Sequence, residues 1–248
     1  MQGKLRKEIF IEKPGNFIDG FLNLILPLNC LICRKGLEPG NKKYLCNCCW
    51  AKIKLIEEPV CSRCGRPSAL SICSSCKTKR YYYRTARAAG IYEGILRECI
   101  HLLKYGKKVC LAKPLGKLLK ELMGNDGNLR KADLLVPVPL DKRRYREREF
   151  NQSHLLAKVV NRYFKIPISS RNLRRTRTTL PQTQLNRKQR EENVRGLFRV
   201  AKAKEYRGKV ILVVDDVFTT GSTVNECAKV LSRAGAQEVH VLTVARGE

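Results

Sequence analysis

Apolar residues beyond position 80 of the chain switch between two spacings. In four segments they recur every three or four residues, which is the period of an amphipathic helix; these segments are 96–103, 115–122, 155–163 and 224–231. In four others they run together or alternate, which is typical of strands; these are 87–92, 134–138, 210–214 and 239–244. This alternation of strands and helices predicts an α/β fold with an open, mainly parallel sheet and helices on both faces.

The first third of the chain follows other patterns. Residues 17–28 have apolar positions at helical spacing and include Pro27, so we expect a short amphipathic helix, well below the ~20 residues of a membrane span. Residues 30–79 contain few aliphatic side chains and many turn formers. We therefore predict three parts, namely a tail with a short helix (1–29), a cysteine-rich module (30–79) and an α/β domain (80–248). With no membrane span and no secretory signal expected, the predicted location is cytoplasmic.

Eight of the twelve cysteines form C-x-x-C pairs. One such turn directs two thiolates at an ion, and two turns complete a tetrahedral zinc site with no open position. Four pairs therefore predict two structural zinc ions, whereas a redox dithiol usually occurs once and near a βαβ unit. A sequential grouping is simplest, although an interleaved one and a role for Cys48 stay open. The predicted ligands are Cys30, Cys33, Cys46, Cys49, Cys61, Cys64, Cys73 and Cys76.

The charge of the chain adds an expectation about its partners. The formal net charge is +28, from 50 Lys and Arg against 22 Asp and Glu. That balance is extreme for an enzyme of small neutral substrates and favours a polyanionic partner, either nucleic acid or a phosphorylated small molecule. A basic surface that serves solubility is the alternative. From 150 to 190 there are ten Lys or Arg and no acid, so Arg174, Arg175 and Arg177 are candidate contacts to single-stranded DNA.

The segment after the apolar strand 210–214 carries the most specific chemistry. Asp215 and Asp216 follow at the carboxyl edge of the sheet, where ligands bind in open α/β folds. A turn rich in hydroxyl groups then enters a helix, whose N–H groups and positive dipole end suit a phosphate. The adjacent acids suit a ribose diol and Mg²⁺. An ordinary Asp/Ser/Thr helix cap is the alternative. The predicted phosphate-binding residues are Thr219, Thr220, Gly221, Ser222 and Thr223.

These residues resemble a known motif. The acids with residues 219–223 are similar to the phosphoribosyl pyrophosphate (PRPP) motif of type I phosphoribosyltransferases. Further segments resemble the ComF family, competence-type proteins in which a double zinc ribbon precedes a phosphoribosyltransferase domain. The likeness covers nearly all of the chain from Phe17 onward; the further segments are 136–140, 148–152, 180–183, 190–194 and 235–236.

One position departs from the family pattern. The family usually reads Arg-Gly-Phe-Asn-Gln, and here Glu149 occupies the glycine position. A side chain there is expected to exclude an easy positive-φ turn and to bring a carboxylate near any pyrophosphate.

The resemblance implies roles for further residues. Residues 136–140 would form the pyrophosphate loop, and residues 176–194 would form a mobile flap. Asp215 and Asp216 would be the catalytic pair that holds the ribose, with Mg²⁺ accompanying PRPP. On the pyrophosphate side and in the flap, the implied residues are Val138, Pro139, Arg148, Gln182 and Arg190.

Three hypotheses about function follow. The first is a Mg²⁺-dependent phosphoribosyltransferase-like protein that acts in DNA uptake. The second is a competence factor that binds single-stranded DNA without transferase turnover and works with other DNA-uptake proteins. The third is a zinc-ribbon scaffold whose sheet domain no longer catalyses. The acceptor base is not specified by these residues.

Overall fold

The computed structural model describes residues 29–37, 44–177 and 187–247. The amphipathic helix predicted at 17–28 lies outside these residues. The chain divides into two compact units, Met1–Lys52 and Ile53–Glu248. In the described part of the chain, no helix is both long and apolar enough to cross a membrane.

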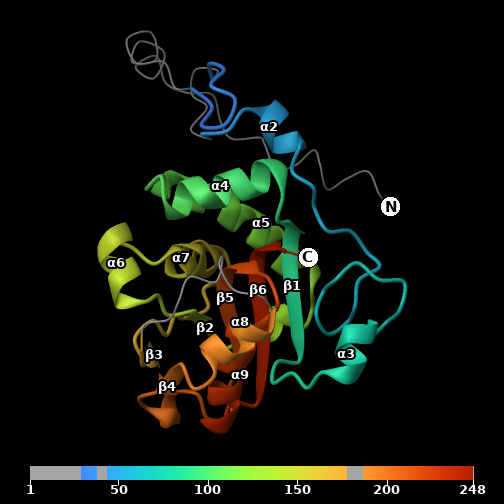
Figure 1. The fold of residues 1–248 in the computed structure, drawn as a ribbon, viewed down its shortest axis with the longest axis vertical. Coiled ribbons are helices and arrows are strands. Elements are labelled where there is room, and N and C mark those ends of the chain that lie inside the picture. The colour runs from blue at the N-terminus through green and yellow to red at the C-terminus, as the bar shows by residue number, and fades with distance from the viewer. Residues whose placement is uncertain (1–28, 38–43, 178–186, 248) are drawn as a thin grey trace. The chain divides into compact units, whose positions relative to one another are not determined.

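The regular elements follow the predicted alternation (Figure 1). The first unit contains helix α2 (Asn47–Ala51). The helices of the second unit are α3 (Ser74–Thr78), α4 (Gly94–Lys104), α5 (Ala112–Asn125), α6 (Lys142–Arg148), α7 (Gln152–Phe164), α8 (Arg187–Val194) and α9 (Ser222–Arg233). The strands are β1 (Thr85–Ile91), β2 (Leu134–Pro137), β3 (Leu173–Arg175), β4 (Phe198–Val200), β5 (Val210–Phe218) and β6 (Glu238–Arg246). Short 3₁₀ turns lie at Val109–Leu111, Leu129–Lys131 and Ala203–Glu205.

The main sheet of the second unit has the strand order β1-β6-β5-β2, and every neighbouring pair is parallel. The predicted parallel α/β architecture is therefore confirmed. A separate antiparallel pair, β3 and β4, was not predicted because each strand has only three residues.

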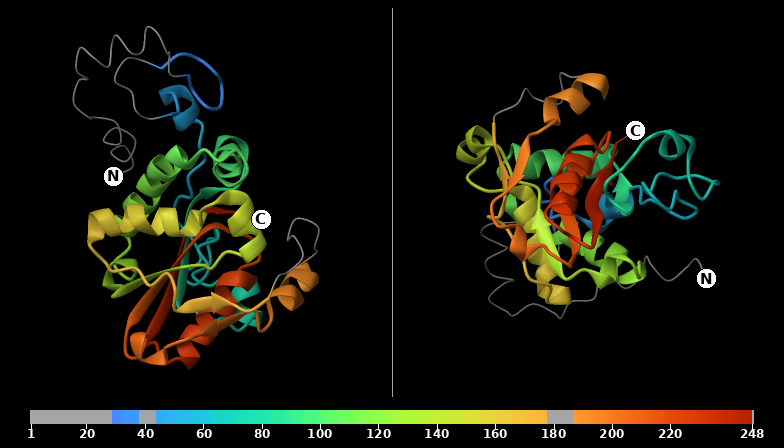
Figure 2. Two further views of the ribbon diagram at one scale, coloured as in Figure 1. Left: turned by 90° about the vertical axis from the view of Figure 1, so that its left-hand side faces the viewer. Right: turned by 90° about the horizontal axis from the view of Figure 1, so that it is seen from below.

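Helices cover both faces of this sheet (Figures 1 and 2). Alternate residues of a strand point to opposite faces. Ile211 and Val213 of β5 share a buried core with Cys227 and Leu231 of α9. Helices α5 and α7 pack against the sheet as well, α5 on β1 and β6 and α7 on β2 and β5. Burial of both faces explains why 210–214 is apolar throughout.

Strand β5 is longer than its apolar run predicted. It continues past 214 to Phe218, because β6 runs beside it as far as Arg246 and pairs its backbone. The prediction that the strand ends before the acids is therefore wrong. Asp215 and Asp216 belong to the strand, which fixes their backbone more firmly than a loop would.

The outer edge of β1 is covered by residues that precede it in the chain. The Ile56 N–H donates to the Ala89 carbonyl at 3.0 Å, and the Ala86 N–H donates to the Arg63 carbonyl at 2.7 Å. A β-carbon at Gly65, whose φ is +68°, would lie 2.5 Å from the Ala86 oxygen. The turn that carries Cys64 therefore packs tightly on the strand and protects an edge that would otherwise pair with another chain.

Candidate functional site

A cavity of about 410 Å³ lies in the second unit at the carboxyl end of β5. It is lined by the end of β5 and the start of α9, by the loop after β2, by α6 and α7, by one face of α4, and by Arg175 of β3. Most of the residues predicted to bind the ribose, the phosphate or the pyrophosphate meet here. Those that line the cavity are Asp215, Asp216, Thr219, Gly221, Ser222, Thr223, Val138, Pro139 and Arg148.

The two acids are buried and are held by the N-terminus of α7 and the C-terminus of α4. The Ser153 hydroxyl and the Asp216 N–H both donate to Asp215 Oδ1, at 2.8 and 2.9 Å. The Gln152 amide donates to Asp216 Oδ1 at 3.2 Å. The Lys104 ammonium forms an ion pair with Asp216 Oδ2. Each carboxyl group is therefore positioned before any ligand arrives.

The two acids differ in protonation. Burial, together with the negative charge of Asp216, raises the pKa of Asp215 to about 8. Burial also opposes ionisation of Asp216, but the Lys104 ammonium outweighs it and lowers the pKa of Asp216. Burial works against the charge on Lys104 too, and the Asp216 carboxylate overrides it and raises the pKa of Lys104. The negative charge of the pair is therefore favoured on Asp216 and disfavoured on Asp215.

The hydroxyl-rich turn presents its residues unequally. Thr219, Gly221, Ser222 and Thr223 line the cavity, whereas the Thr220 hydroxyl lies 2.6 Å from Ser222 Oγ and supports that side chain. Gly221 has φ +77° and is the N-cap of α9. The first turn of α9 thus faces the cavity with its positive dipole end, which is a favourable place for a phosphate.

Basic side chains surround the rest of the cavity. The buried Arg148 guanidinium donates to Gln152 Oε1 at 3.0 Å and lies 4.9 Å from the Tyr105 ring centre. Burial lowers the pKa of Arg148, but a guanidinium remains charged in proteins. Lys104 compensates the charge of Asp216, and the four arginines outnumber Asp215, so the cavity is positive. The basic residues that line it are Arg97, Lys104, Arg144, Arg148 and Arg175.

Helix α4 contributes polar side chains to the cavity that were not among the predicted site residues. Arg97, His101, Lys104 and Tyr105 all line the cavity, and their spacing places them on one face of the helix. The buried residues of α4, among them Leu103, occupy the neighbouring face. The sequence contains these polar residues beside the apolar positions of the helix. It does not indicate that they face the acids of β5, because that depends on how the helix packs in the fold.

The three arginines predicted to contact nucleic acid do not lie on one surface. Arg175 lines the cavity, with Nε 3.9 Å from Asp141 Oδ2. Arg174, the preceding residue on β3, is exposed, as the alternation of a strand requires. Arg177 is exposed, and its guanidinium donates to the carbonyls of Asn193 and Arg195, at 3.4 and 3.2 Å.

Two predicted flap residues are described only in part or not at all. Gln182 lies outside the described residues. Arg190 belongs to α8, and its side chain is not among those described. Helix α8 itself was not predicted, because its sequence RKQREENV has one apolar residue and therefore no hydrophobic periodicity.

Glu149 keeps the turn that its side chain was expected to exclude. Its φ is +70°, its N–H caps α6 by donating to the Tyr145 carbonyl at 2.7 Å, and its carboxylate pairs with Lys107 at 2.7 Å. The expectation that glutamate excludes a positive φ here is therefore wrong. The cap hydrogen bond and the ion pair offset the strain of a left-handed non-glycine residue.

Glu149→Gly is expected to stabilise the protein by up to about 1 kcal/mol, because glycine adopts a positive φ without strain. The loss of an exposed ion pair reduces this gain, since such pairs contribute about 0–1 kcal/mol. Urea denaturation measures the difference. Glu149→Ala is the matched control, since it removes the ion pair but keeps a β-carbon, and it should give no gain. Equal stabilisation by both variants would contradict the role assigned to φ.

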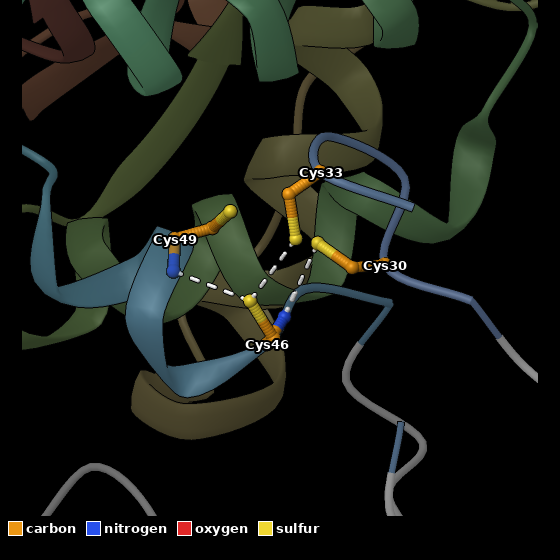
Figure 3. Close-up of side chains that lie close together, drawn as sticks. All are labelled: Cys30, Cys33, Cys46 and Cys49. Atoms are coloured by element: carbon orange, nitrogen blue, oxygen red, sulfur yellow. Dashed lines mark hydrogen bonds between the residues drawn. The ribbon is translucent and has the colours of Figure 1, made fainter. Parts of the chain in front are cut away.

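The first cysteine group lies in the first unit and has the geometry of a zinc site (Figure 3). The sulfurs of Cys33 and Cys46 are 3.6 Å apart, and the Cys46 and Cys49 N–H groups donate to the sulfurs of Cys30 and Cys46. All four sulfurs lie within 4.8 Å of one another. A tetrahedral ion with Zn–S bonds of about 2.3 Å needs sulfurs about 3.8 Å apart, so these residues fit zinc.

The second group lies in the second unit and is fully buried. The sulfurs of Cys64 and Cys73 are 3.7 Å apart, and the Cys73 N–H donates to Cys61 Sγ at 3.3 Å. The sequential grouping is therefore confirmed, and Cys48 is exposed and belongs to neither group. Four sulfur ligands leave no open position, so both sites suit structural zinc.

Comparisons with known proteins agree with this arrangement. Residues 21–78 match the family described as "Double zinc ribbon domain", and residues 151–248 match "Phosphoribosyl transferase domain". The chain is 33% identical to "DNA utilization protein YhgH" of Escherichia coli over 90% of this chain and 99% of the relative. It is 31% identical to "Competence protein F" of Haemophilus influenzae, over 88% and 96%. It is 28% identical to "Competence protein ComFC" of Bacillus subtilis, over 85% and 86%.

Proposed function

Because the chain belongs to the ComF family, in which a double zinc ribbon precedes a phosphoribosyltransferase domain, we propose that its cavity binds a ribose 5-phosphate unit, with PRPP as the complete ligand. One observation carries the proposal: a buried acid pair and the N-terminus of α9 open into the same cavity. The first suits a diol and the second suits a phosphate.

The proposed pose assigns each part of the ligand by its chemistry. The 5′-phosphate accepts hydrogen bonds from the turn Thr219–Thr223 at the start of α9. The ribose hydroxyls lie at the acids and hydrogen-bond to Asp215 and Asp216. The pyrophosphate lies toward Arg148 and Arg175, beside the loop at Pro139.

We propose that Mg²⁺ enters with the pyrophosphate and is not a resident ion of the acid pair. Carboxylate oxygens suit Mg²⁺, but the raised pKa of Asp215 and the Lys104 ammonium on Asp216 leave this pair little negative charge for a divalent ion. Mg²⁺ bound to the pyrophosphate would neutralise part of its charge, and the basic residues of the cavity would stabilise it as a leaving group.

The biological setting that we propose is DNA uptake in the cytoplasm. The names of the relatives, "DNA utilization protein" and "Competence protein F", support that role. Thiolate zinc sites persist where cysteines stay reduced, which supports the location. The net charge of +28 and exposed arginines such as Arg174 and Arg177 support single-stranded DNA as a second ligand, at a surface separate from the cavity.

Substitutions at two neighbouring arginines distinguish PRPP binding from DNA binding. Arg175→Gln is expected to weaken PRPP binding at least about tenfold, because a hydrogen bond to a charged group contributes about 1.5–3 kcal/mol. Arg174→Gln should leave PRPP affinity unchanged, since its side chain is on the opposite, exposed side of β3. Isothermal titration with PRPP and Mg²⁺ measures both, and the thermal midpoint of each free variant controls for folding.

The same variants are then titrated with single-stranded DNA at two salt concentrations. Arg174→Gln should weaken DNA binding and reduce its salt dependence, and Arg175→Gln should change it less. If both substitutions weaken PRPP binding equally, the ligand is not in this cavity.

A further inference from the structure

Arg246, the last residue of β6, contacts two functional parts of the second unit. Its side chain is buried. One guanidinium nitrogen, Nη1, donates to the Cys64 carbonyl at 2.6 Å, and the other, Nη2, lies 3.8 Å from Cys64 Sγ. The same guanidinium lies over the Phe218 ring, 4.6 Å from its centre. One planar cation thus contacts both a cysteine of the second group and an aromatic residue of the cavity.

Phe218 in turn supports the phosphate-binding turn. Its ring lines the cavity and is almost wholly buried. A β-carbon at Gly221 would lie only 2.5 Å from Phe218 Cζ, so the turn rests directly on the ring. The Gly247 N–H donates to the Phe218 carbonyl at 2.8 Å, which ties the residue after Arg246 to the same place. The Phe218 ring therefore lies between the Arg246 guanidinium and Gly221, so a movement of the guanidinium would displace the ring and with it the turn.

The chemistry of a zinc site explains why the contact with Cys64 matters. Four thiolates with one Zn²⁺ carry a net charge of about −2, and buried thiolates need hydrogen-bond donors around them. Arg246 supplies a positive charge and a planar pair of donors at this place. Zinc would hold the four sulfurs at one point and so fix the Cys64 carbonyl and sulfur that Arg246 contacts; without zinc the cysteine turn loses this constraint.

We propose that Arg246 is a positioning residue that couples zinc binding at the second cysteine group to the conformation of the phosphate-binding turn. With zinc bound, Arg246 is held by Cys64 and keeps Phe218 beneath Gly221. Without zinc, the ring and the turn are released. The coupling concerns the chain itself, and its effect on ligand affinity rests on the proposed function.

Such coupling is reciprocal by thermodynamic necessity. If zinc at the second group favours the ligand-binding turn, a ligand on that turn must strengthen zinc binding by the same factor. Release of this zinc to a chelator should therefore slow when ribose 5-phosphate is bound.

The test compares two arginines that hold the same cysteine turn. Arg246→Gln in the zinc-loaded full chain should speed the release of one of the two zinc ions about 10- to 100-fold, as expected for the loss of a partner of a metal ligand. Amide hydrogen exchange in residues 217–224 should rise in the same variant. Arg87→Gln is the matched control. Arg87 also holds the cysteine turn, because it donates to the Ser62 carbonyl at 3.0 Å, and it pairs with Asp126. It lies on β1, however, and not over the Phe218 ring. It should leave exchange in residues 217–224 unchanged.

A second variant covers the case in which Arg246→Gln fails to fold. Phe218→Leu keeps the contacts of Arg246 with Cys64 and removes the ring, so zinc removal should no longer alter exchange in residues 217–224. The coupling is wrong if Arg246→Gln leaves both rates at wild-type values, or if zinc removal leaves exchange in this turn unchanged in the wild type. If ribose 5-phosphate fails to bind the wild type, the proposed function fails, and the exchange measurements still decide the coupling.

Discussion

Lys104→Met is expected to destabilise the protein by about 3–5 kcal/mol at neutral pH, because removing one partner of a buried ion pair leaves the other charge uncompensated. The Asp216 carboxylate is almost fully buried, and Lys104 is the cation that pairs with it. Methionine keeps most of the length and the apolar surface of the lysine stem, so the substitution changes mainly the charge. Urea denaturation at pH 8 measures the loss.

The pH dependence of this loss identifies its cause. In the wild type the pKa of Asp216 is lowered, so the ionised pair stabilises the fold above the unfolded pKa of about 3.9 and this stability is lost as pH falls. In Lys104→Met, burial without a cation raises the pKa of Asp216, so the destabilisation is largest at neutral pH and shrinks toward pH 4. The double variant Lys104→Met/Asp216→Asn should recover most of the stability at pH 8. A loss that is the same at pH 5 and pH 8 would contradict the ion-pair explanation.

Gly221→Ala is expected to lower stability by about 2–4 kcal/mol, because it combines a left-handed backbone with a clash. The φ of Gly221 is +77°, and the added β-carbon would lie 2.5 Å from the buried Phe218 ring. Since the turn must shift away from the ring, the donors of α9 lose their alignment. Affinity for ribose 5-phosphate should fall at least about tenfold for each charged hydrogen bond lost. Thermal unfolding and calorimetric titration measure the two effects.

Gly196→Ala separates the two causes. Gly196 has φ +66°, but a β-carbon there would meet nothing within 4 Å. This control therefore reports backbone strain alone, about 1 kcal/mol, with ligand affinity unchanged. If Gly221→Ala costs no more stability than Gly196→Ala, the turn does not rest on Phe218 as described.

The features predicted correctly from the sequence are those encoded by neighbouring residues. The C-x-x-C pairs specify a cysteine turn within four residues, and the run 210–214 specifies a strand buried on both faces. The turn Thr219–Thr223 follows the end of β5 at Phe218 directly. Each of these signals is local, so the order of residues was enough to predict zinc groups, a parallel strand and a turn at its end.

The features missed depend on partners far apart in the chain. Lys104 pairs with Asp216 only because α4 and β5 meet in the fold, and nothing near residue 104 shows that partner. The true end of β5 is set by its pairing with β6. The cavity position of Arg175 follows from a three-residue strand too short for a recognisable alternation. Arg246 belongs to the same class, since its two contacts come from β5 and from the cysteine turn.

We propose that the acid pair and the start of α9 together bind the phosphate and the ribose of one ligand. A crystal structure of the zinc-loaded protein with ribose 5-phosphate tests it most directly. The phosphate is expected within hydrogen-bond distance of the N–H groups and hydroxyls of residues 219–223, with the ribose hydroxyls at Asp215 and Asp216. A phosphate held elsewhere, or a turn whose amides are bonded to protein groups at saturating ligand, would contradict it.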